Sequence, residues 1–451
     1  MGEWRGILIG MAVAIVAFFA VSEYASLPLA QSLLVALVAF MVVLWTNEAL
    51  PLGIVSLLPI VLFPAFEILS IQKTTANYAN PIIYLFLGGF MLAVATEKTG
   101  LHKIIAKRLL QAFPNTPRGI IASLGITASC LSMILSNTTT ALLLLPVALS
   151  ISEDRFLKIR FLLAVAFGAS IGGITTPIGS PPNLILLGFL DKQGMDPIGF
   201  AAWVAMMLPV TMMMLYIMVN VLSFRSGDHT LNAEAFHEVH FDHHQKRLTW
   251  ILGILVTLLF VNSPIKPFYS GLGLNENAIL LGFGMLMFVP KIGFLEWKDS
   301  KKIPYEIMFL FGAGFCIASA FSDTGLAQSV SKALEHVSAL PIILIVLAVA
   351  TFAIFATEIL SNTALISILL PIVYAAVHTL DFPLEEELIM ITATICTSYA
   401  FMLPIATPPN AIAISGGDLK VSEMARFGFL LNIAGVLIVS AIALSYWKLF
   451  L

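Results

Sequence analysis

The sequence contains few charged residues and very few cysteines. Only 11% of its 451 residues are charged, 59% are hydrophobic, and the mean hydropathy is +0.97. Soluble domains carry about 25% charged residues, so we expect most of this chain to lie in lipid. A formal net charge of −3 provides no basic surface for a phosphate backbone, which excludes a nucleic-acid partner. The cysteines lie in apolar stretches without metal-ligand spacing and are interpreted as packing residues: Cys130, Cys316 and Cys396.

Apolar runs of membrane-spanning character occur along the whole chain. A crossing of the hydrocarbon core needs about 20 residues. Residues 1–28 are interpreted as an extra N-terminal transmembrane helix rather than a signal peptide, because only Arg5 precedes the apolar run. The sequence therefore predicts an all-α polytopic membrane protein with eleven transmembrane helices: 6–21, 29–45, 50–66, 81–96, 161–190, 200–222, 248–261, 275–289, 305–321, 388–414 and 427–447.

Two further apolar stretches, 119–150 and 341–377, do not fit that count. Each is split by the same triplet, Ser136-Asn137-Thr138 and Ser361-Asn362-Thr363, whose residues favour helix caps and turns over helix interiors. The arm at 139–150 would reach only about 18 Å as a helix, which is too short to cross. We therefore predict two re-entrant helical hairpins whose tips end inside the membrane.

The distribution of basic residues predicts the orientation. If the hairpins do not cross, 18 of the 23 Lys and Arg residues fall on one side of the membrane. The richer side is cytoplasmic by the positive-inside rule. We therefore expect a cytoplasmic N-terminus, a cytoplasmic linker at 223–247 and an external C-terminus.

The two halves of the chain repeat each other at a nearly constant spacing. The Ser-Asn-Thr triplet at 136–138 recurs at 361–363, and at almost the same spacing Pro177-Ile178-Gly179-Ser180-Pro181-Pro182-Asn183 recurs as Pro404-Ile405-Ala406-Thr407-Pro408-Pro409-Asn410. Each copy contains five predicted crossings and one hairpin. Because five is odd, the second copy must be inverted, as in many secondary transporters. The predicted repeats are 29–222, with a hairpin at 119–150 and a broken helix at 161–190, and 248–451, with a hairpin at 341–377 and a broken helix at 388–414.

The four predicted breaks in the helices favour ion binding. A break leaves free carbonyls on one half-helix and free amides on the next. Carbonyl, hydroxyl and amide oxygens suit a bare cation such as sodium, whereas amides at a helix N-terminus suit a carboxylate. Because no Lys or Arg is near a break in the sequence, a bound anion would be held by neutral donors and by co-bound cations.

For two other features, Glu358 and the linker histidines, the sequence allows more than one role. Glu358 is the one carboxylate close to a break, and it can serve ion coupling or packing. The linker 223–247 contains five histidines, which fit either a metal site or, with more weight, a solvated cytoplasmic segment. They are His229, His237, His240, His243 and His244.

The duplicated triplets and the duplicated Pro-Pro-Asn loops resemble the divalent anion/sodium symporter family of di- and tricarboxylate carriers. The resemblance implies a homodimer in the bacterial inner membrane, surrounded by lipid, that works by an elevator-type movement. It implies two or more co-transported sodium ions, one around Ser132, Ser136, Asn137 and Gly179, and another around Thr357, Leu360, Asn362 and Ala406. The residues implied for the substrate are Asn137, Thr138, Ser180, Asn362, Thr363 and Thr407.

We therefore expect sodium-coupled symport of C4-dicarboxylates such as succinate, malate and fumarate. An antiporter of the same fold that exchanges citrate or 2-oxoglutarate for succinate is the alternative, and a sulfate symporter has less weight. An enzyme is not expected, because the sequence has neither a His-Glu-x-x-His motif nor a convincing Gly-x-Ser-x-Gly elbow.

Overall fold

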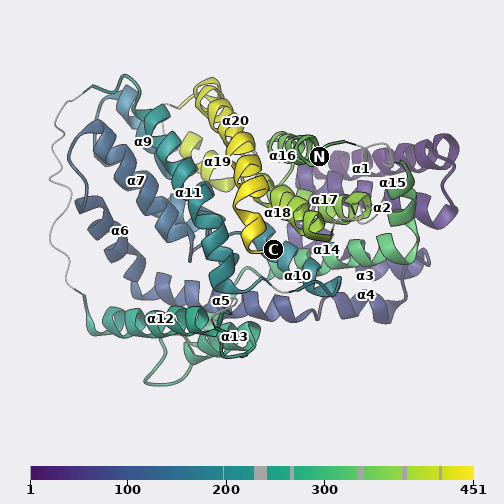
Figure 1. Cartoon of the computed structure of the whole chain (residues 1–451), viewed down its shortest axis with the longest axis horizontal. Helices are drawn as coiled ribbons and strands as arrows, with labels where there is room; N and C mark the ends of the chain where they lie inside the picture. Colours follow the sequence, from purple (N-terminus) through teal and green to yellow (C-terminus); the bar gives the residue numbers. More distant parts are fainter. Residues whose placement is uncertain are drawn as a thin grey trace.

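The computed structural model describes residues 2–196, 198–227, 241–264, 269–333, 340–377, 383–415 and 419–451, and its long elements are all helices (Figure 1). The α-helices of the first half are α1 (Gly2–Phe19), α2 (Leu29–Asn47), α3 (Leu52–Ala65), α4 (Ile71–Asn77), α5 (Pro81–Thr99), α6 (Leu101–Gln111), α7 (Pro117–Ser132), α8 (Asn137–Ser150), α9 (Arg155–Gly173), α10 (Pro181–Lys192) and α11 (Phe200–Ser223). Those of the second half are α12 (His243–Asn262), α13 (Glu276–Leu286), α14 (Tyr305–Asp323), α15 (Leu326–Ala333), α16 (Ile342–Ala356), α17 (Asn362–Val377), α18 (Pro383–Thr397), α19 (Pro408–Ser415) and α20 (Val421–Ser445).

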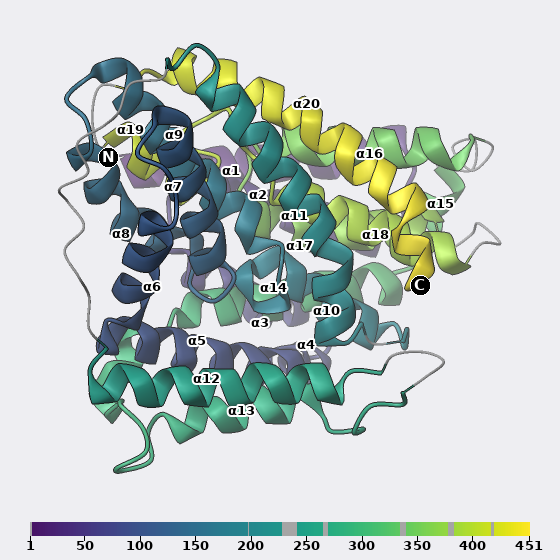
Figure 2. The ribbon, with the colours of Figure 1, turned by 60° about the vertical axis from the view of Figure 1, so that its left-hand side comes forward.

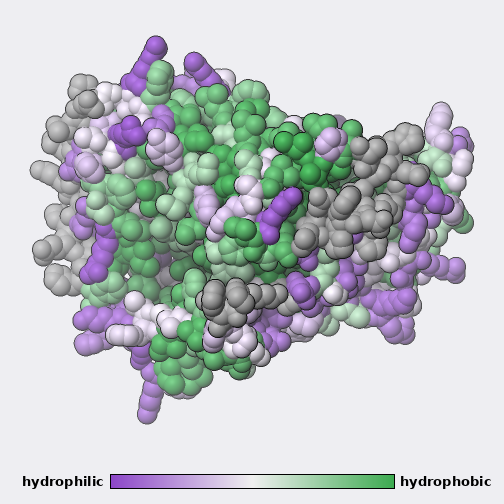
Figure 3. Space-filling model, viewed as in Figure 1, coloured by the Kyte–Doolittle hydropathy of each residue, from purple (hydrophilic) through white to green (hydrophobic). Residues whose placement is uncertain are grey.

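Within the described residues, seven helices are long and apolar enough to cross a membrane. The others that are apolar are shorter, and they include α8, α16 and α17. Hydrophobic residues cover the centre of the face in Figure 3, and hydrophilic residues gather toward its margins. The protein is therefore an all-helical, polytopic integral membrane protein. The seven spans are Trp4–Tyr24, Leu29–Asn47, Ile71–Thr99, Arg155–Gly173, Phe200–Ser223, Tyr305–Asp323 and Val421–Leu449.

The segments expected to form hairpins and broken helices have clear boundaries. The segment 119–150 forms α7 and α8, and 341–377 forms α16 and α17. The segment 161–190 forms α9 and α10, and 388–414 forms α18 and α19, each pair separated by an unwound loop. Helix α9 begins at Arg155, before the apolar run, because the side chain of Asp154 caps it by accepting the N–H of Phe156.

The helices pack into two groups. The first, here called the hairpin body, contains α7–α11 and α16–α20, in which α7 and α8 pack along α9, and α16 and α17 pack along α18. The second, here called the scaffold body, contains α1–α6 and α12–α15, in which α5 packs along α13 and α3 along α14. Figure 2 shows α5, α12 and α13 side by side along one edge of the molecule. The two bodies meet where α14 contacts α17 and α10, where α6 packs on α7, and where α15 packs on α17.

Helices α5 and α14, which are repeat mates, run in opposite directions past one another. Phe86 and Phe311, which occupy matching positions of the two repeats, have ring centroids 4.2 Å apart. Lys98 at the end of α5 pairs with Asp299 just before α14, and Lys73 before α5 pairs with Asp323 at the end of α14, both at 2.6 Å. Opposite orientation of repeat mates is what an inverted repeat requires.

Candidate functional site

The first hairpin tip joins the end of α7 to the start of α8. The hydroxyl of Ser132 donates to Oδ1 of Asn137, and the hydroxyl of Ser136 accepts the N–H of Thr139 at 3.1 Å. Ser136 is therefore the N-cap of α8, the role that serine favours. Asn137 is half-buried and Thr138 beside it is also half-buried, so the tip offers polar atoms next to a partly accessible space.

The unwound loop between α9 and α10 closes onto this tip. A β-carbon at Gly179 would lie 2.6 Å from the carbonyl oxygen of Gly173 and 2.9 Å from that of Ser132. One at Gly173 would lie 2.8 Å from Oδ1 of Asn137 and 3.3 Å from the carbonyl oxygen of Gly179. Three backbone carbonyls and one side-chain amide oxygen thus converge where only glycine leaves room.

Two side chains hold this loop in its unwound form. Nδ2 of Asn183 donates to the carbonyl oxygens of Gly173 at 3.0 Å and Thr176 at 2.9 Å. The hydroxyl of Thr176 donates to the carbonyl oxygen of Met133 at 2.5 Å. The asparagine of the Pro-Pro-Asn motif therefore satisfies carbonyls that the break in the helix leaves free.

The second tip repeats these contacts at the matching positions. The hydroxyl of Thr357 lies 2.7 Å from Oδ1 of Asn362 and 2.9 Å from the carbonyl oxygen of Thr397. Nδ2 of Asn410 donates to the carbonyl oxygens of Ala400 and Leu403, both at 3.0 Å. The repeated sequence motifs are thus matched by repeated hydrogen bonds.

The contacts of Glu358 define its structural role, which the sequence alone leaves open. Its buried carboxylate accepts the N–H groups of Phe401 at 2.8 Å and of Met402 and Leu403 at 2.9 Å, and Nδ2 of Asn432 at 2.7 Å. The carboxylate therefore holds the unwound loop between α18 and α19, with α20 as a further anchor.

The remaining predicted residues of the second half lie at the edges of the same break. Leu360 is half-buried, and its N–H donates to the carbonyl oxygen of Ala356 at 3.0 Å. Ala406 is buried, and the hydroxyl of Thr407 accepts the N–H of Asn410 at 3.4 Å. Thr363 is half-buried next to Asn362.

The two unwound loops meet at the centre of the hairpin body. The hydroxyls of Ser180 and Ser398 lie 3.4 Å apart, and the rings of Phe167 and Phe401 lie 5.2 Å apart. Helix α19 packs on α8, and α10 packs on α17, so each unwound helix contacts the hairpin of the other half. The structure thus brings the two breaks together through their loops.

A cavity of about 350 Å³ lies between the first hairpin tip and the scaffold body. Its polar lining includes Ser136, Thr138 and Gly179 of the hairpin body, opposite α5 and the start of α14. Of the residues predicted for the substrate, Asn137, Ser180, Asn362, Thr363 and Thr407 lie outside this lining. The cavity therefore reaches Ser136, Thr138 and Gly179 of the first half and no predicted site residue of the second half.

The cavity also contains charged side chains that no sequence pattern predicts there. Lys302, Glu97 and Glu306 line it, and Nζ of Lys302 lies 3.2 Å from Oε1 of Glu97. The expectation that no basic residue lies near a break is wrong in space, because the segment before α14 lies across the cavity from the first hairpin tip. No local pattern around Lys302 signals this contact.

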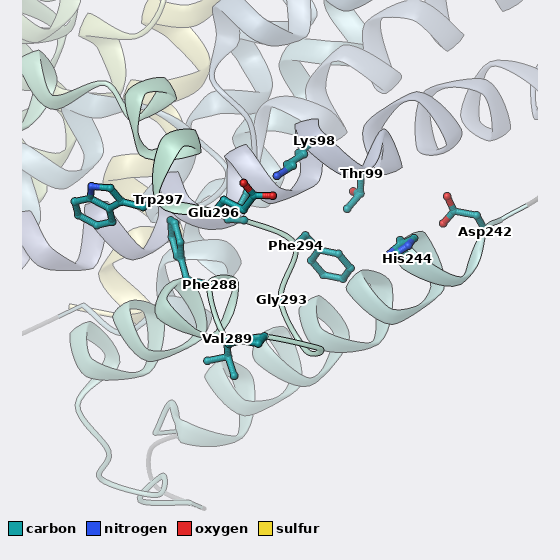
Figure 4. A pocket seen from close by; sticks show the side chains of 12 residues that line it. Lys98, Thr99, Asp242, His244, Phe288, Val289, Gly293, Phe294, Glu296 and Trp297 are labelled. Atoms are coloured by element: carbon teal, nitrogen blue, oxygen red, sulfur yellow. The ribbon is translucent and has the colours of Figure 1, made fainter.

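The histidine-containing linker is only partly described. His229, His237 and His240 lie outside the described residues, and the described part of the chain contains no group of three potential metal ligands. Figure 4 shows His244 and Asp242 across a surface depression of about 880 Å³ from Lys98 and Glu296, with Phe294 between them. These described histidines give no support to a metal site.

A polytopic helical protein with two unwound helices, each beside a polar hairpin tip, belongs to the class of secondary transporters. The profile of the citrate transporter family, CitMHS, matches residues 40–395. The chain belongs to this family and is a transporter of the divalent anion/sodium symporter type, not an enzyme.

Individual relatives and a solved structure extend this comparison. The chain is 33% identical over 428 residues to an uncharacterized transporter of Haemophilus influenzae, covering 91% of each chain. It is 28% identical over 428 residues to the sodium-dependent dicarboxylate transporter SdcS of Staphylococcus saprophyticus, covering 88% of this chain and 82% of the relative. The YdaH transporter of Alcanivorax borkumensis superposes with a TM-score of 0.59 at 13% identity, over 83% of this chain and 88% of that one, which is a likeness of fold alone.

Proposed function

We propose that this protein imports C4-dicarboxylates such as succinate, malate and fumarate together with sodium. The observation that carries the proposal is the pair of hydroxyl-to-asparagine contacts, Ser132 to Asn137 and Thr357 to Asn362, each beside an unwound loop. The dicarboxylate and sodium named for the SdcS relatives support the same reading.

Sodium is assigned to the oxygens that converge at each tip. In the first half, the carbonyls of Ser132 and Gly179, with Asn137 and Ser136, offer hard oxygens. In the second half, Thr357 and Asn362 supply the equivalent oxygens, with Leu360 and Ala406 beside them. Hydroxyl, amide and carbonyl oxygens at broken helices are what sodium-coupled transporters use. We propose two such sites as a minimum.

The substrate carboxylates are assigned to neutral donors near the same tips. Asn137, Thr138 and Ser180 would meet one carboxylate, and Asn362, Thr363 and Thr407 the other. Thr138 lines the cavity from the first turn of α8, and amides without intrahelical partners in a first turn are a favourable setting for an anion. Two bound sodium ions would compensate the charge of a dianion.

The proposed architecture has eleven crossings, two re-entrant hairpins and two inverted repeats. The antiparallel crossing of α5 and α14 supports the inversion. The lengths of α8 and α16, which are 14 and 15 residues, support arms that stop within a membrane about 30 Å thick. We place the N-terminus in the cytoplasm of a bacterial cell and the C-terminus outside the inner membrane, and we propose a homodimer.

The proposed mechanism is an elevator movement of the hairpin body past the scaffold body. The lining of the cavity includes Lys302 and Glu97, which lie in segments assigned to the cytoplasmic side. We therefore assign this conformation as open to the cytoplasm. Movement of the hairpin body would carry both half-sites to the other side as one unit.

The test is uptake of labelled succinate into proteoliposomes with an inward sodium gradient. Uptake should rise with sodium and fall to the protein-free level in choline. Equal uptake in choline would rule out sodium coupling. Vesicles preloaded with succinate, citrate or sulfate form the second arm, because uptake that occurs only with internal substrate would replace symport by exchange.

A further inference from the structure

Lys192, in the last turn of α10, lies across the boundary between the two bodies. Its Nζ donates to Oδ1 of Asn77 at 2.6 Å, to the carbonyl oxygen of Phe315 at 2.7 Å and to the hydroxyl of Ser319. The Ser319 hydroxyl also donates to Oδ1 of Asn77 at 3.0 Å. Lys192 belongs to the hairpin body, and all three acceptors belong to α4 and α14 of the scaffold body.

The position of Lys192 links it to the transport site. Helix α10 begins at Pro181, which lines the cavity beside the first hairpin tip, and ends at Lys192, about 17 Å further along its axis. One end of α10 thus faces the open cavity, while the other end is fixed to the scaffold body. The ammonium group uses all three of its donors in this contact.

A second polar contact joins the two bodies on the same side. The N–H of Phe200 at the start of α11 donates to both carboxylate oxygens of Glu276, at 3.1 and 3.0 Å. The N–H of Ala201 donates to the hydroxyl of Ser263 at 3.1 Å. The connection from α10 to α11 is therefore held to the scaffold body at both of its ends.

These contacts depend on one relative position of the bodies. N–H···O hydrogen bonds have donor–acceptor distances of about 2.7–3.2 Å, whereas a slide of one helical turn is about 5.4 Å. We propose that Lys192 is a conformational lock, which stabilises the state with the first hairpin tip open to the cytoplasm and separates from Asn77 and Ser319 when the hairpin body moves. This inference rests on the elevator movement proposed above.

The experiment measures how fast a cysteine at Ala93 reacts with a membrane-impermeant maleimide in inside-out vesicles. Ala93 lines the cavity and is half-buried, so its labelling reports the open state. Protein with only the three native cysteines gives the background. The test variant is Lys192→Met, which keeps an unbranched chain and removes the donors. The matched control is Lys73→Met, an exposed lysine of α4 whose ion pair with Asp323 lies within the scaffold body.

Lys192→Met should slow labelling by up to about tenfold, the scale for losing hydrogen bonds to a charged group, and Lys73→Met should leave the rate unchanged. Ser319→Ala should slow labelling less, and it should add nothing to Lys192→Met because both remove one interaction. If Lys192→Met does not fold, Ser319→Ala and Asn77→Ala give the same test from the scaffold side. Unchanged labelling in the variants that fold would overturn the lock.

Succinate uptake by the unmodified protein is measured in parallel, so that the two proposals fail separately. Sodium-driven uptake with labelling that ignores Lys192 and Ser319 overturns the lock and leaves the proposed function standing. Labelling that responds to Lys192 without sodium-driven uptake overturns the proposed function and supports a conformational lock in a transporter of another substrate.

Discussion

The two halves of the site use the same backbone plan but hold their unwound loops with different groups. In the first half, the carbonyl oxygen of Met133 accepts one hydroxyl, that of Thr176. In the second half, the residue at the matching position is Glu358, whose carboxylate accepts three backbone N–H groups and Asn432. Hydrogen bonds to an ionised acceptor are roughly twice as strong as neutral ones. The second loop is therefore expected to be the more rigid.

A second difference lies in the small residue of each loop. Gly179 is packed against carbonyl oxygens that leave no space for a β-carbon, whereas the matching position in the second half is Ala406. The first half-site thus depends on the absence of a side chain, and the second depends on a buried carboxylate. Substitutions at matching positions of the two halves should therefore have different effects on transport.

The largest loss of uptake is expected at the two tip asparagines, where the two halves are alike. Asn137→Ala and Asn362→Ala should each reduce sodium-driven uptake by ~100-fold or more, because each removes an amide assigned to a cation and to the substrate, and an unpaired buried group costs about 1–3 kcal/mol. Uptake assays on purified, monodisperse protein measure this. Asn220→Ala on α11 is the control, since Asn220 pairs with Arg118 away from the breaks. Normal uptake in either tip variant would remove that tip from the site.

A smaller effect, confined to one half, is expected at Glu358. Glu358→Gln should raise the sodium concentration for half-maximal uptake by about tenfold, because one acceptor oxygen becomes a donor that faces backbone N–H groups. Met133→Leu is the matched control in the first half and should stay within about twofold, since Met133 acts there through its backbone. Equal responses at the two positions would contradict the asymmetry of the halves.

Substitution of the small loop residues, Gly179 and Ala406, should lower sodium affinity moderately, and by different amounts in the two halves. Gly179→Ala places a methyl group 2.6 Å from the carbonyl oxygen of Gly173, so the carbonyls must separate and sodium affinity should fall several-fold. Ala406→Gly removes a methyl group and costs at most about 1 kcal/mol of stability. Sodium titrations of uptake compare the two. An identical loss in both variants would show that the crowding at Gly179 is unimportant for sodium.

Much of this architecture could be predicted from the sequence. The Ser-Asn-Thr and Pro-Pro-Asn repeats locate the starts of α8, α10, α17 and α19, because capping and proline effects are local. The sequence places the start of α9 too late, since charged residues such as Arg155 and Lys158 interrupt the apolar run, although a helix can continue beyond the lipid.

Contacts between distant segments could not be predicted in the same way. The role of Glu358 depends on a loop that lies far along the chain, at Phe401. The positions of Lys192 and Lys302 depend on how α10 and the segment before α14 pack against the other body. The sequence around Lys192 does not predict its hydrogen-bond acceptors, because one of them, the carbonyl oxygen of Phe315, lies on a helix in the other half of the chain.

The smallest effect, a change in thermal stability, is expected at the two ion pairs that join the two halves of the chain. Lys98 and Asp299 are 33% and 12% exposed, whereas Lys73 and Asp323 are 65% and 37% exposed. Exposed pairs contribute about 0–1 kcal/mol, so Asp299→Asn should lower the unfolding temperature slightly and Asp323→Asn less. The N–H of Glu296, and then Lys98, lower the pKa of Asp299. The contribution of Asp299 to the stability of the folded protein is therefore present at neutral pH and is lost as the pH falls through that lowered pKa. Thermal unfolding at neutral and acidic pH measures both variants. A larger loss for Asp323→Asn would mean that exposure does not set the strength of these pairs.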